Sequence, residues 1–316
     1  MGNTNRDLQK ARNTKDDEFY TLYETVEDEI KYYTKYIENK IIYLNTDNPE
    51  NSNFWKYFYD NFKELKIKKL ISTYYNPDGI SYKTTYDGDN LIKEQLKEDG
   101  DFRSEECINI LKESDIVITN PPFSLMREFI LQVLEYNKKL LIIATENVPA
   151  YKEIFPLIKD NKLWLGVNFG TIEFKVPYDE SNKTKSKYRL GEDGQEYRGL
   201  GNTIWITNIH NKRQSNILEL TKTYNKEDYP IYDNYNAIEV SRYKNIPKDY
   251  YGIMGVPITF LKYHNPEQFK ILGTQRHAKS KELLNVYTGS RVPIEKDNEL
   301  RLDGRELFTR VFIKRI

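Results

Sequence analysis

Short apolar runs separated by amphipathic helical segments recur through the first 170 residues of this 316-residue chain. Four runs have the length of buried strands: IIYLN at 41–45, KLIST at 69–73, DIVIT at 115–119 and LLIIA at 140–144. Before and between them, apolar spacings of three and four predict helices over 23–38, 54–65 and 124–136, the last with Ser124 as its N-cap. Strands that alternate with helices form a parallel sheet. We therefore expect an α/β fold with a doubly wound, mostly parallel sheet.

Two regions depart from this alternation. The run ISYKTTY and the turn signal DGDN predict a hairpin within residues 80–102. Beyond residue 170, TIEFKV and TIWIT predict antiparallel strands on either side of a polar loop at 181–199. Because the pattern changes again near residue 210, we expect one domain at 1–210 and a separate region at 211–316.

The composition indicates a globular protein of the cytoplasm. Hydrophobic residues make up 38% and charged residues 30% of the chain, which excludes collagenous and disordered classes. The single cysteine, Cys107, cannot form an internal disulfide, as is usual in a reducing compartment. No apolar run approaches the roughly 20 residues of a membrane span, and the first residues lack a signal-peptide core. We expect no association with a membrane.

Charge is distributed unevenly although the formal net charge is zero. Residues 1–120 carry 17 basic and 24 acidic side chains, whereas residues 241–316 carry 15 basic and 8 acidic ones. A basic tail would allow one end of the molecule to contact a polyanion such as a nucleic acid. The alternative interpretation is an uneven but ordinary solvated surface.

The most informative motif is Asn120-Pro121-Pro122-Phe123, which directly follows a predicted buried strand. In a doubly wound sheet, ligands bind at the carboxyl ends of the strands. Two consecutive prolines remove two N–H donors and leave their carbonyl groups available as acceptors. The Asn120 side-chain oxygen and the Pro121 carbonyl could then accept from one amino group, while Phe123 offers a face for stacking a planar base. A plain Pro-Pro turn is the structural alternative.

Such a motif suits methylation of an amino group on a heterocycle. An aromatic amine is a poor nucleophile because its lone pair is delocalised into the ring. Two acceptors that bind its protons favour a tetrahedral nitrogen and support the positive charge that develops during attack. No strongly basic residue is required.

Two weaker signals precede this motif. In Gly100-Asp101-Phe102, expected at another strand end, the carboxylate could accept from the amino group of a cofactor's adenine while the Phe102 ring packs beside it. In Glu18-Phe19-Tyr20-Thr21, the threonine at the start of the first helix could cap that helix or bind a cofactor carboxylate.

Together these segments make the chain resemble the EcoRI-type adenine-specific DNA methyltransferases from about residue 15 to its end. The similarity is carried by EFYT, DNPENSNFW (47–55), GDF, NPPFS, NTIWITNI (202–209), YPIYDNYNAIEV (229–240), MGVPITFL (254–261) and NPEQFKILG (265–273). The resemblance implies a site-specific enzyme that uses S-adenosylmethionine to methylate adenine N6 and flips the target base out of double-stranded DNA. Residues 1–210 would form its catalytic and cofactor-binding domain, and residues 211–316 its target-recognition region.

The resemblance also implies roles for individual residues. The catalytic motif matches Asn120, Pro121, Pro122 and Phe123, and the cofactor-binding segments match Thr21, Asp47, Ser52, Asn53, Phe54, Asp101, Phe102 and Asn120. No glycine follows the first strand, where many methyltransferases have a glycine-rich cofactor loop. Nor does an acidic residue end the second strand, and Asp78 is the nearest candidate for binding a ribose.

The basic tail is expected to contact DNA phosphates. Its basic residues are interleaved with tyrosines: Arg242, Lys244, Lys248, Arg276, Lys279, Lys281 and Arg291 lie among Tyr243, Tyr250, Tyr251 and Tyr263. The absence of heptads and of a large apolar stripe suggests a monomer. The sequence is compatible with a separately encoded restriction endonuclease as partner, and also with a solitary or phage-borne methylase.

Other functions find less support in the sequence. The histidines His210, His264 and His277 lack the spacing of a metal site or hydrolytic pair, so we expect no metal. No P-loop is present, and no restriction-nuclease signature follows Pro77-Asp78. An RNA or glutamine-amide methyltransferase and a non-catalytic DNA-binding relative remain as alternatives.

Overall fold

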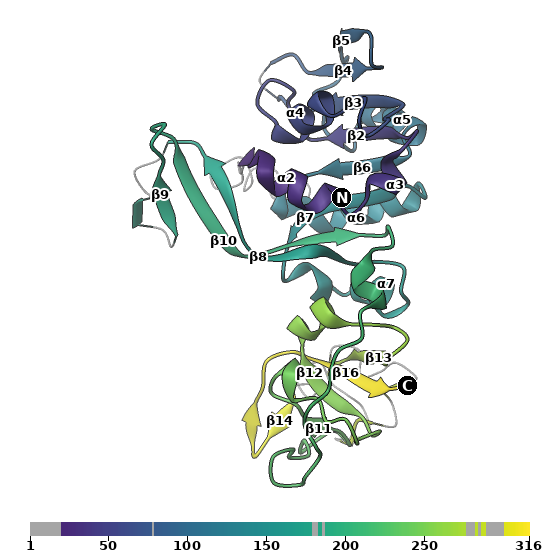
Figure 1. The fold of residues 1–316 in the computed structure, drawn as a ribbon, viewed down its shortest axis with the longest axis vertical. Coiled ribbons are helices and arrows are strands. Elements are labelled where there is room, and N and C mark those ends of the chain that lie inside the picture. Colours follow the sequence, from purple (N-terminus) through teal and green to yellow (C-terminus); the bar gives the residue numbers. More distant parts are fainter. Residues whose placement is uncertain are drawn as a thin grey trace, which may run out of the picture. The chain divides into compact units, whose positions relative to one another are not determined.

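The computed structural model describes residues 20–77, 79–178, 183–184, 187–275, 282–283, 286–288 and 300–316 (Figure 1). The chain forms two compact units. The first comprises Met1–Pro149 with Leu165–Ile209, and the second comprises Ala150–Trp164 with His210–Ile316. The segment Ala150–Trp164 thus packs with the second unit, although it precedes the change of pattern near residue 210.

The first unit is built on one large sheet, with ten strands in the described residues. Along the sheet the order is β1 (Tyr20–Thr21), β8 (Trp164–Val176), β10 (Glu196–Thr207), β7 (Lys139–Thr145), β6 (Ile116–Thr119), β2 (Ile41–Asn45), β3 (Lys69–Thr73), β4 (Tyr82–Tyr86) and β5 (Leu91–Gln95), with β9 (Tyr188–Leu190) paired to β10. The four buried strands expected from the sequence are β2, β3, β6 and β7, and the expected hairpin is β4–β5.

The sheet is mixed. Parallel pairing joins β3, β2, β6 and β7, which are the strands connected through helices. In contrast, β4 pairs antiparallel with β3 and β5, and β10 pairs antiparallel with β7. A short turn at 87–90 joins β4 to β5, and such a turn can only reverse the chain. The expectation of a mostly parallel sheet therefore holds for the centre of the sheet and is wrong for its sides.

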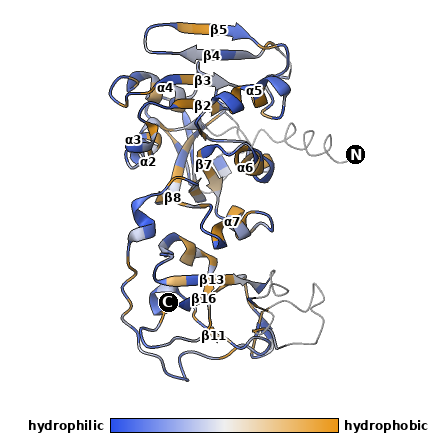
Figure 2. Ribbon diagram, turned by 90° about the vertical axis from the view of Figure 1, so that its right-hand side faces the viewer, coloured by the Kyte–Doolittle hydropathy of each residue, from blue (hydrophilic) through white to orange (hydrophobic). Residues whose placement is uncertain are grey.

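Helices cover both faces of this sheet (Figure 2). The helices α2 (Tyr23–Ile30), α3 (Thr34–Ile37) and α4 (Asn53–Asp60) pack apolar residues on the face that carries Ile42, Leu44 and Ile118. The helices α5 (Glu105–Glu113) and α6 (Met126–Glu135) lie on the opposite side. The single helix expected over 23–38 is divided by a turn at 31–33.

The second unit contains a four-stranded sheet in the order β11 (Ile238–Glu239), β12 (Met254–Pro257), β16 (Arg310–Arg315) and β13 (Phe269–Thr274). It also contains the hairpin β14–β15 (Arg301–Leu302, Arg305–Glu306), the helix α7 (Phe155–Lys159) and the 3₁₀ turns η5 (Lys212–Ser215), η6 (Tyr243–Asn245) and η7 (Ile258–Tyr263). The family-like stretch MGVPITFL thus forms β12 and the start of η7. Within the described residues, none of the helices in either unit has the length and apolar character needed to cross a membrane.

Candidate active site

The order of the parallel strands creates a switch point between β2 and β6. From β2 the chain adds β3 on one side, and it later returns to place β6 on the other. Loops that leave neighbouring strands at such a point diverge and open a crevice at their carboxyl ends. Asp47 follows β2 and Asn120 follows β6, so both lie at this edge of the sheet.

Asp47 connects the loops around the switch point. One carboxylate oxygen accepts from the Ser52 hydroxyl at 2.5 Å, and the other accepts from the Thr119 hydroxyl. The Asp47 backbone carbonyl accepts from the Ser72 hydroxyl at the end of β3. Burial raises the pKa of Asp47 to about 6, and the hydrogen bonds from Ser52 and Thr119 oppose this rise. Asp47 therefore joins the start of α4 to the residue that precedes Asn120.

Thr46, and not a glycine, forms the sharp turn after β2. Its φ of 104° lies in a region that β-branched residues rarely adopt. Its N–H donates to the Thr73 carbonyl at 2.9 Å, and its hydroxyl lies 2.9 Å from the Thr119 hydroxyl and 3.4 Å from the Asn120 carbonyl. These contacts hold the sharp turn in place and bring the loop after β2 against the start of the NPPF motif.

Four of the residues expected at the cofactor site lie at or beside the start of α4: Thr21, Ser52, Asn53 and Phe54. The Ser52 hydroxyl caps the helix by accepting from the N–H groups of Phe54 at 3.1 Å and Trp55 at 3.3 Å. The Asn53 amide donates to the Thr21 carbonyl at 2.8 Å and links the helix to β1. The Phe54 ring is buried against Trp205 and belongs to the core.

Thr21 lies in β1 and does not cap α2. Thr21 pairs with Phe174 of β8, and the N-cap of α2 is Leu22, without a side-chain hydrogen bond. The Thr21 hydroxyl is buried and makes no hydrogen bond within the described part of the chain. Since a buried hydroxyl is rarely left unsatisfied, this atom suggests a place for a polar ligand group.

The NPPF motif lies between β6 and α6. The Pro122 carbonyl accepts from the N–H of Leu125 at 3.0 Å, whereas no described backbone N–H donates to the Pro121 carbonyl. Phe123 begins the 3₁₀ turn η2 (Phe123–Leu125) and packs partly against the core. The prediction that Ser124 caps the following helix is wrong, because this turn intervenes and Leu125 is the N-cap of α6.

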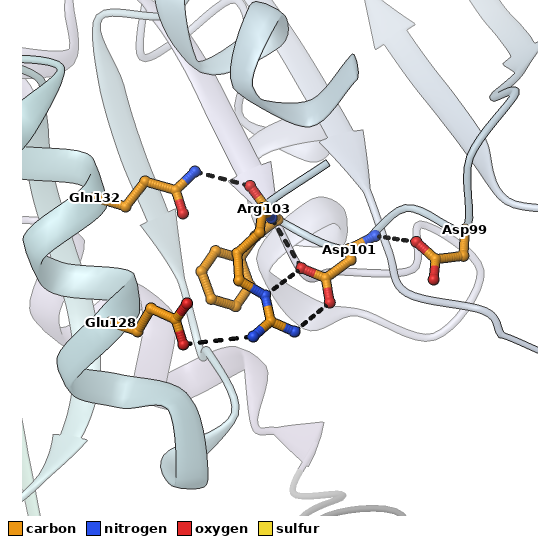
Figure 3. Close-up of polar contacts among 6 residues, drawn as sticks. Asp99, Asp101, Arg103, Glu128 and Gln132 are labelled. Carbon is orange, nitrogen blue, oxygen red and sulfur yellow. Dashed lines mark hydrogen bonds and ion pairs between the residues drawn. The ribbon is translucent and has the colours of Figure 1, made fainter. Parts of the chain in front are cut away.

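The GDF segment lies in the loop between β5 and α5 rather than directly at a strand end. Phe102 is 3% exposed and packs edge-on against Phe129 of α6, with a centroid distance of 5.1 Å. The Asp101 carboxylate forms a two-pronged ion pair with Arg103 (Figure 3). Arg103 was not expected at this site, although its position two residues after Asp101 was a signal.

Three of the basic residues expected to contact DNA are exposed around η6 in the second unit: Arg242, Lys244 and Lys248. Between them, Tyr243 stacks on Tyr263 with a centroid distance of 3.9 Å. The expected contacts Arg276, Lys279, Lys281 and Arg291, and the candidate ribose ligand Asp78, lie outside the described residues.

The histidines have structural neighbours. The His264 ring lies 3.0 Å from the Phe269 carbonyl, and burial lowers the pKa of His264. His210 contacts the edge of Trp164, and His277 lies outside the described residues. Within the described ranges, no group of three or more potential ligand residues could hold a metal ion.

Comparison with known proteins gives a consistent result. The family model described as adenine-specific methyltransferase EcoRI matches residues 7–316. Over 302 residues the chain is 43% identical to the type II methyltransferase M.EcoRI from Escherichia coli. The aligned region covers 89% of this chain and 92% of the relative. It is 35% identical over 314 residues to the type II methyltransferase M.MpnI from Mycoplasma pneumoniae, covering 96% and 97% of the two chains.

A second mycoplasma relative has the same level of identity. This protein, the type II methyltransferase M.MgeORF184P from Mycoplasma genitalium, is 35% identical over 310 residues, with 97% of this chain and 98% of the relative covered. Among solved structures, the proposed RNA methyltransferase PH1948 from Pyrococcus horikoshii gives a TM-score of 0.33 at 16% identity, covering 66% of this chain and 98% of that chain. That likeness is too distant to bear on the substrate.

Proposed function

The chain belongs to the adenine-specific EcoRI methyltransferase family and is a DNA adenine methyltransferase, and we propose that it transfers a methyl group from S-adenosylmethionine to N6 of an adenine flipped out of duplex DNA. The type II designation of its relatives supports a role in restriction–modification. The observation that carries the proposal is the Asp47–Thr119 hydrogen bond, which joins the loop after β2 to the strand that delivers Asn120.

The residues at the start of α4 fit the cofactor. The Thr21 carbonyl accepts from Asn53, and the Thr21 hydroxyl has no partner among the described residues. A polar group of the methionine part of the cofactor could bond to this hydroxyl. The amino group of the adenine would bond to Asp101. When bound, S-adenosylmethionine supplies a methyl group on a positively charged sulfur.

At the catalytic motif, Asn120 and Pro121 act on the target amino group. Their two oxygens would accept hydrogen bonds from its two N–H groups and favour the tetrahedral nitrogen that attacks the methyl carbon. The cofactor would supply the methyl group for a new N–C bond at N6 in exchange for its S–C bond, and the surplus proton of the methylated amine would pass to solvent. The half-buried Phe123 would cover one face of the flipped base.

The second unit is proposed to bind the DNA. Exposed Arg242, Lys244 and Lys248 suit contacts to phosphates, which position the protein without reading sequence. Flipping the adenine costs about a few kcal/mol, because the base leaves its stack and its partner. A monomer is sufficient for one methyl transfer, so the rate should be proportional to enzyme concentration.

The test is incubation of the purified protein with duplex DNA and S-adenosylmethionine carrying a labelled methyl group, followed by nucleoside analysis. We expect label in N6-methyladenine. Label in 4-methylcytosine, in RNA or in protein glutamine would refute the proposal and support the corresponding alternative.

Asn120→Ala should lower the rate of transfer about 10²–10³-fold while DNA and cofactor binding persist, because one acceptor in a desolvated site is lost. An unchanged rate would remove Asn120 from the mechanism.

A further inference from the structure

We infer that Arg103 is a positioning residue that fixes the Asp101 carboxylate for recognition of the cofactor's adenine. The inference rests on the proposed use of S-adenosylmethionine and concerns how the site distinguishes adenine from other bases. It begins from the ion pair between Asp101 and Arg103, two residues of one loop.

The ion pair fixes both oxygens of the carboxylate (Figure 3). One oxygen accepts from the backbone N–H of Arg103 at 2.8 Å and from its Nε at 2.9 Å, and the other accepts from Nη2 at 2.6 Å. The two side chains are only 20% and 17% exposed. A two-pronged pair of this kind fixes the orientation of the carboxylate as well as its charge.

The backbone beneath the pair is fixed independently. The Asp101 N–H donates to an Asp99 carboxylate oxygen at 3.1 Å, and the Asp99 carbonyl accepts from Asn76 N–H at 2.8 Å and from the Ser81 hydroxyl at 2.6 Å. Gly100 has a φ of 77°, and a Cβ there would lie 2.1 Å from the Tyr74 carbonyl oxygen. The loop path is therefore set by the chain after β3, and Arg103 sets only the rotation of the Asp101 side chain.

This arrangement leaves capacity for one ligand. An ionised carboxylate has about four acceptor positions, two on each oxygen. The first oxygen is filled by two donors of Arg103, whereas the oxygen bonded to Nη2 keeps one position that no residue described by the structure fills. The exocyclic amino group of an adenine is a suitable donor for it, and a purine with a carbonyl at that position would be repelled.

Arg103 also connects this loop to α6. Its Nη1 lies 3.4 Å from a Glu128 carboxylate oxygen, and its guanidinium lies over the Phe102 ring at 5.2 Å. The Gln132 amide donates to the Phe102 carbonyl at 2.9 Å. Since α6 follows the NPPF motif, the adenine-binding loop and the catalytic loop share one support.

The experiment compares binding of S-adenosylhomocysteine with binding of its inosine counterpart, in which a carbonyl replaces the amino group. Affinities are measured by calorimetry on the full chain for the wild type, R103M, R103K and E128Q. We expect the wild type to prefer the adenine compound by about tenfold to a hundredfold, as a hydrogen bond to a charged group allows. R103M should lose most of this preference, R103K should retain an intermediate preference, and E128Q should keep the wild-type ratio.

The ratio of the affinities for the adenine and inosine compounds distinguishes loss of carboxylate positioning from general destabilisation of the protein. A variant that is merely destabilised weakens binding of both compounds alike and leaves the ratio unchanged. If R103M does not fold, R103Q carries the same expectation, because it also lacks the two-pronged pair. A wild-type ratio in whichever of these two variants folds would overturn the inference. A wild type that binds neither compound would instead refute the proposed cofactor.

Discussion

Replacing Asp47 by asparagine should change how the stability of the protein depends on pH. Burial raises the pKa of Asp47 to about 6, against an ordinary value of 3.8. Between these two values the folded protein keeps a proton that the unfolded chain has lost. The contribution of Asp47 to the free energy of unfolding is therefore present in full below pH 4 and is lost as the pH rises through 6.

The size of the effect follows from the pKa values. A rise from 3.8 to about 6 corresponds to about 3 kcal/mol, of which about 2–3 kcal/mol falls between pH 4 and pH 7. Asparagine cannot ionise, and its amide can still bond to the Ser52 and Thr119 hydroxyls. The free energy of unfolding of the wild type, relative to Asp47→Asn, should fall by that amount over this range.

The assay is urea unfolding of both proteins at several pH values, followed by circular dichroism. Other titrating groups cancel in the difference between the two proteins. Ser72→Ala is the matched control, since its hydroxyl donates to the Asp47 carbonyl and not to the carboxylate. Its difference from the wild type should stay constant with pH. A constant difference for Asp47→Asn as well would refute the conclusion that this carboxylate is destabilised by burial.

Two further predictions concern the loop after β2 and the basic surface. Thr46→Gly should be about 1 kcal/mol more stable than Thr46→Ala in urea unfolding, because only glycine adopts a φ of 104° without strain, and the opposite order would contradict this conformation. Replacing Arg242, Lys244 and Lys248 together by alanine should reduce the salt dependence of DNA binding by about one unit of slope per lost phosphate contact. Cofactor affinity without DNA should not change, and an unaltered slope would show that these side chains do not contact phosphates.

The elements that could be predicted from the sequence are those whose pattern reflects local burial. The strands β2, β3, β6 and β7 are short apolar runs because both of their faces are covered. The break between α2 and α3 could not be predicted, because Tyr33 continues the helical spacing across the turn and is buried all the same. The antiparallel position of β10 beside β7 depends on long-range pairing, which leaves no local signal.

The candidate site shows the same division. Asn120 and its neighbours could be found because a motif of fixed residues follows a buried strand. Thr46 could not, since a threonine with a positive φ is stabilised only by contacts to strands that lie 27 and 73 residues further along the chain. Arg103 differs from Thr46, because its main partner Asp101 is only two residues away in the sequence, and only its contact with Glu128 of α6 is long-range.

The path of the chain affects how the second unit could be exchanged between relatives. Ala150–Trp164 supplies α7, whose buried Phe155 and Ile158 belong to the same compact unit as β13, more than a hundred residues later. A gene fusion with a single crossover near residue 210 would therefore pair α7 from one parent with strands from the other. A recombinant that keeps the second unit intact would need two inherited segments, 150–164 and 210–316, to come from the same parent. During synthesis, β13 cannot cover the apolar face of α7 until residues 269–274 have emerged from the ribosome.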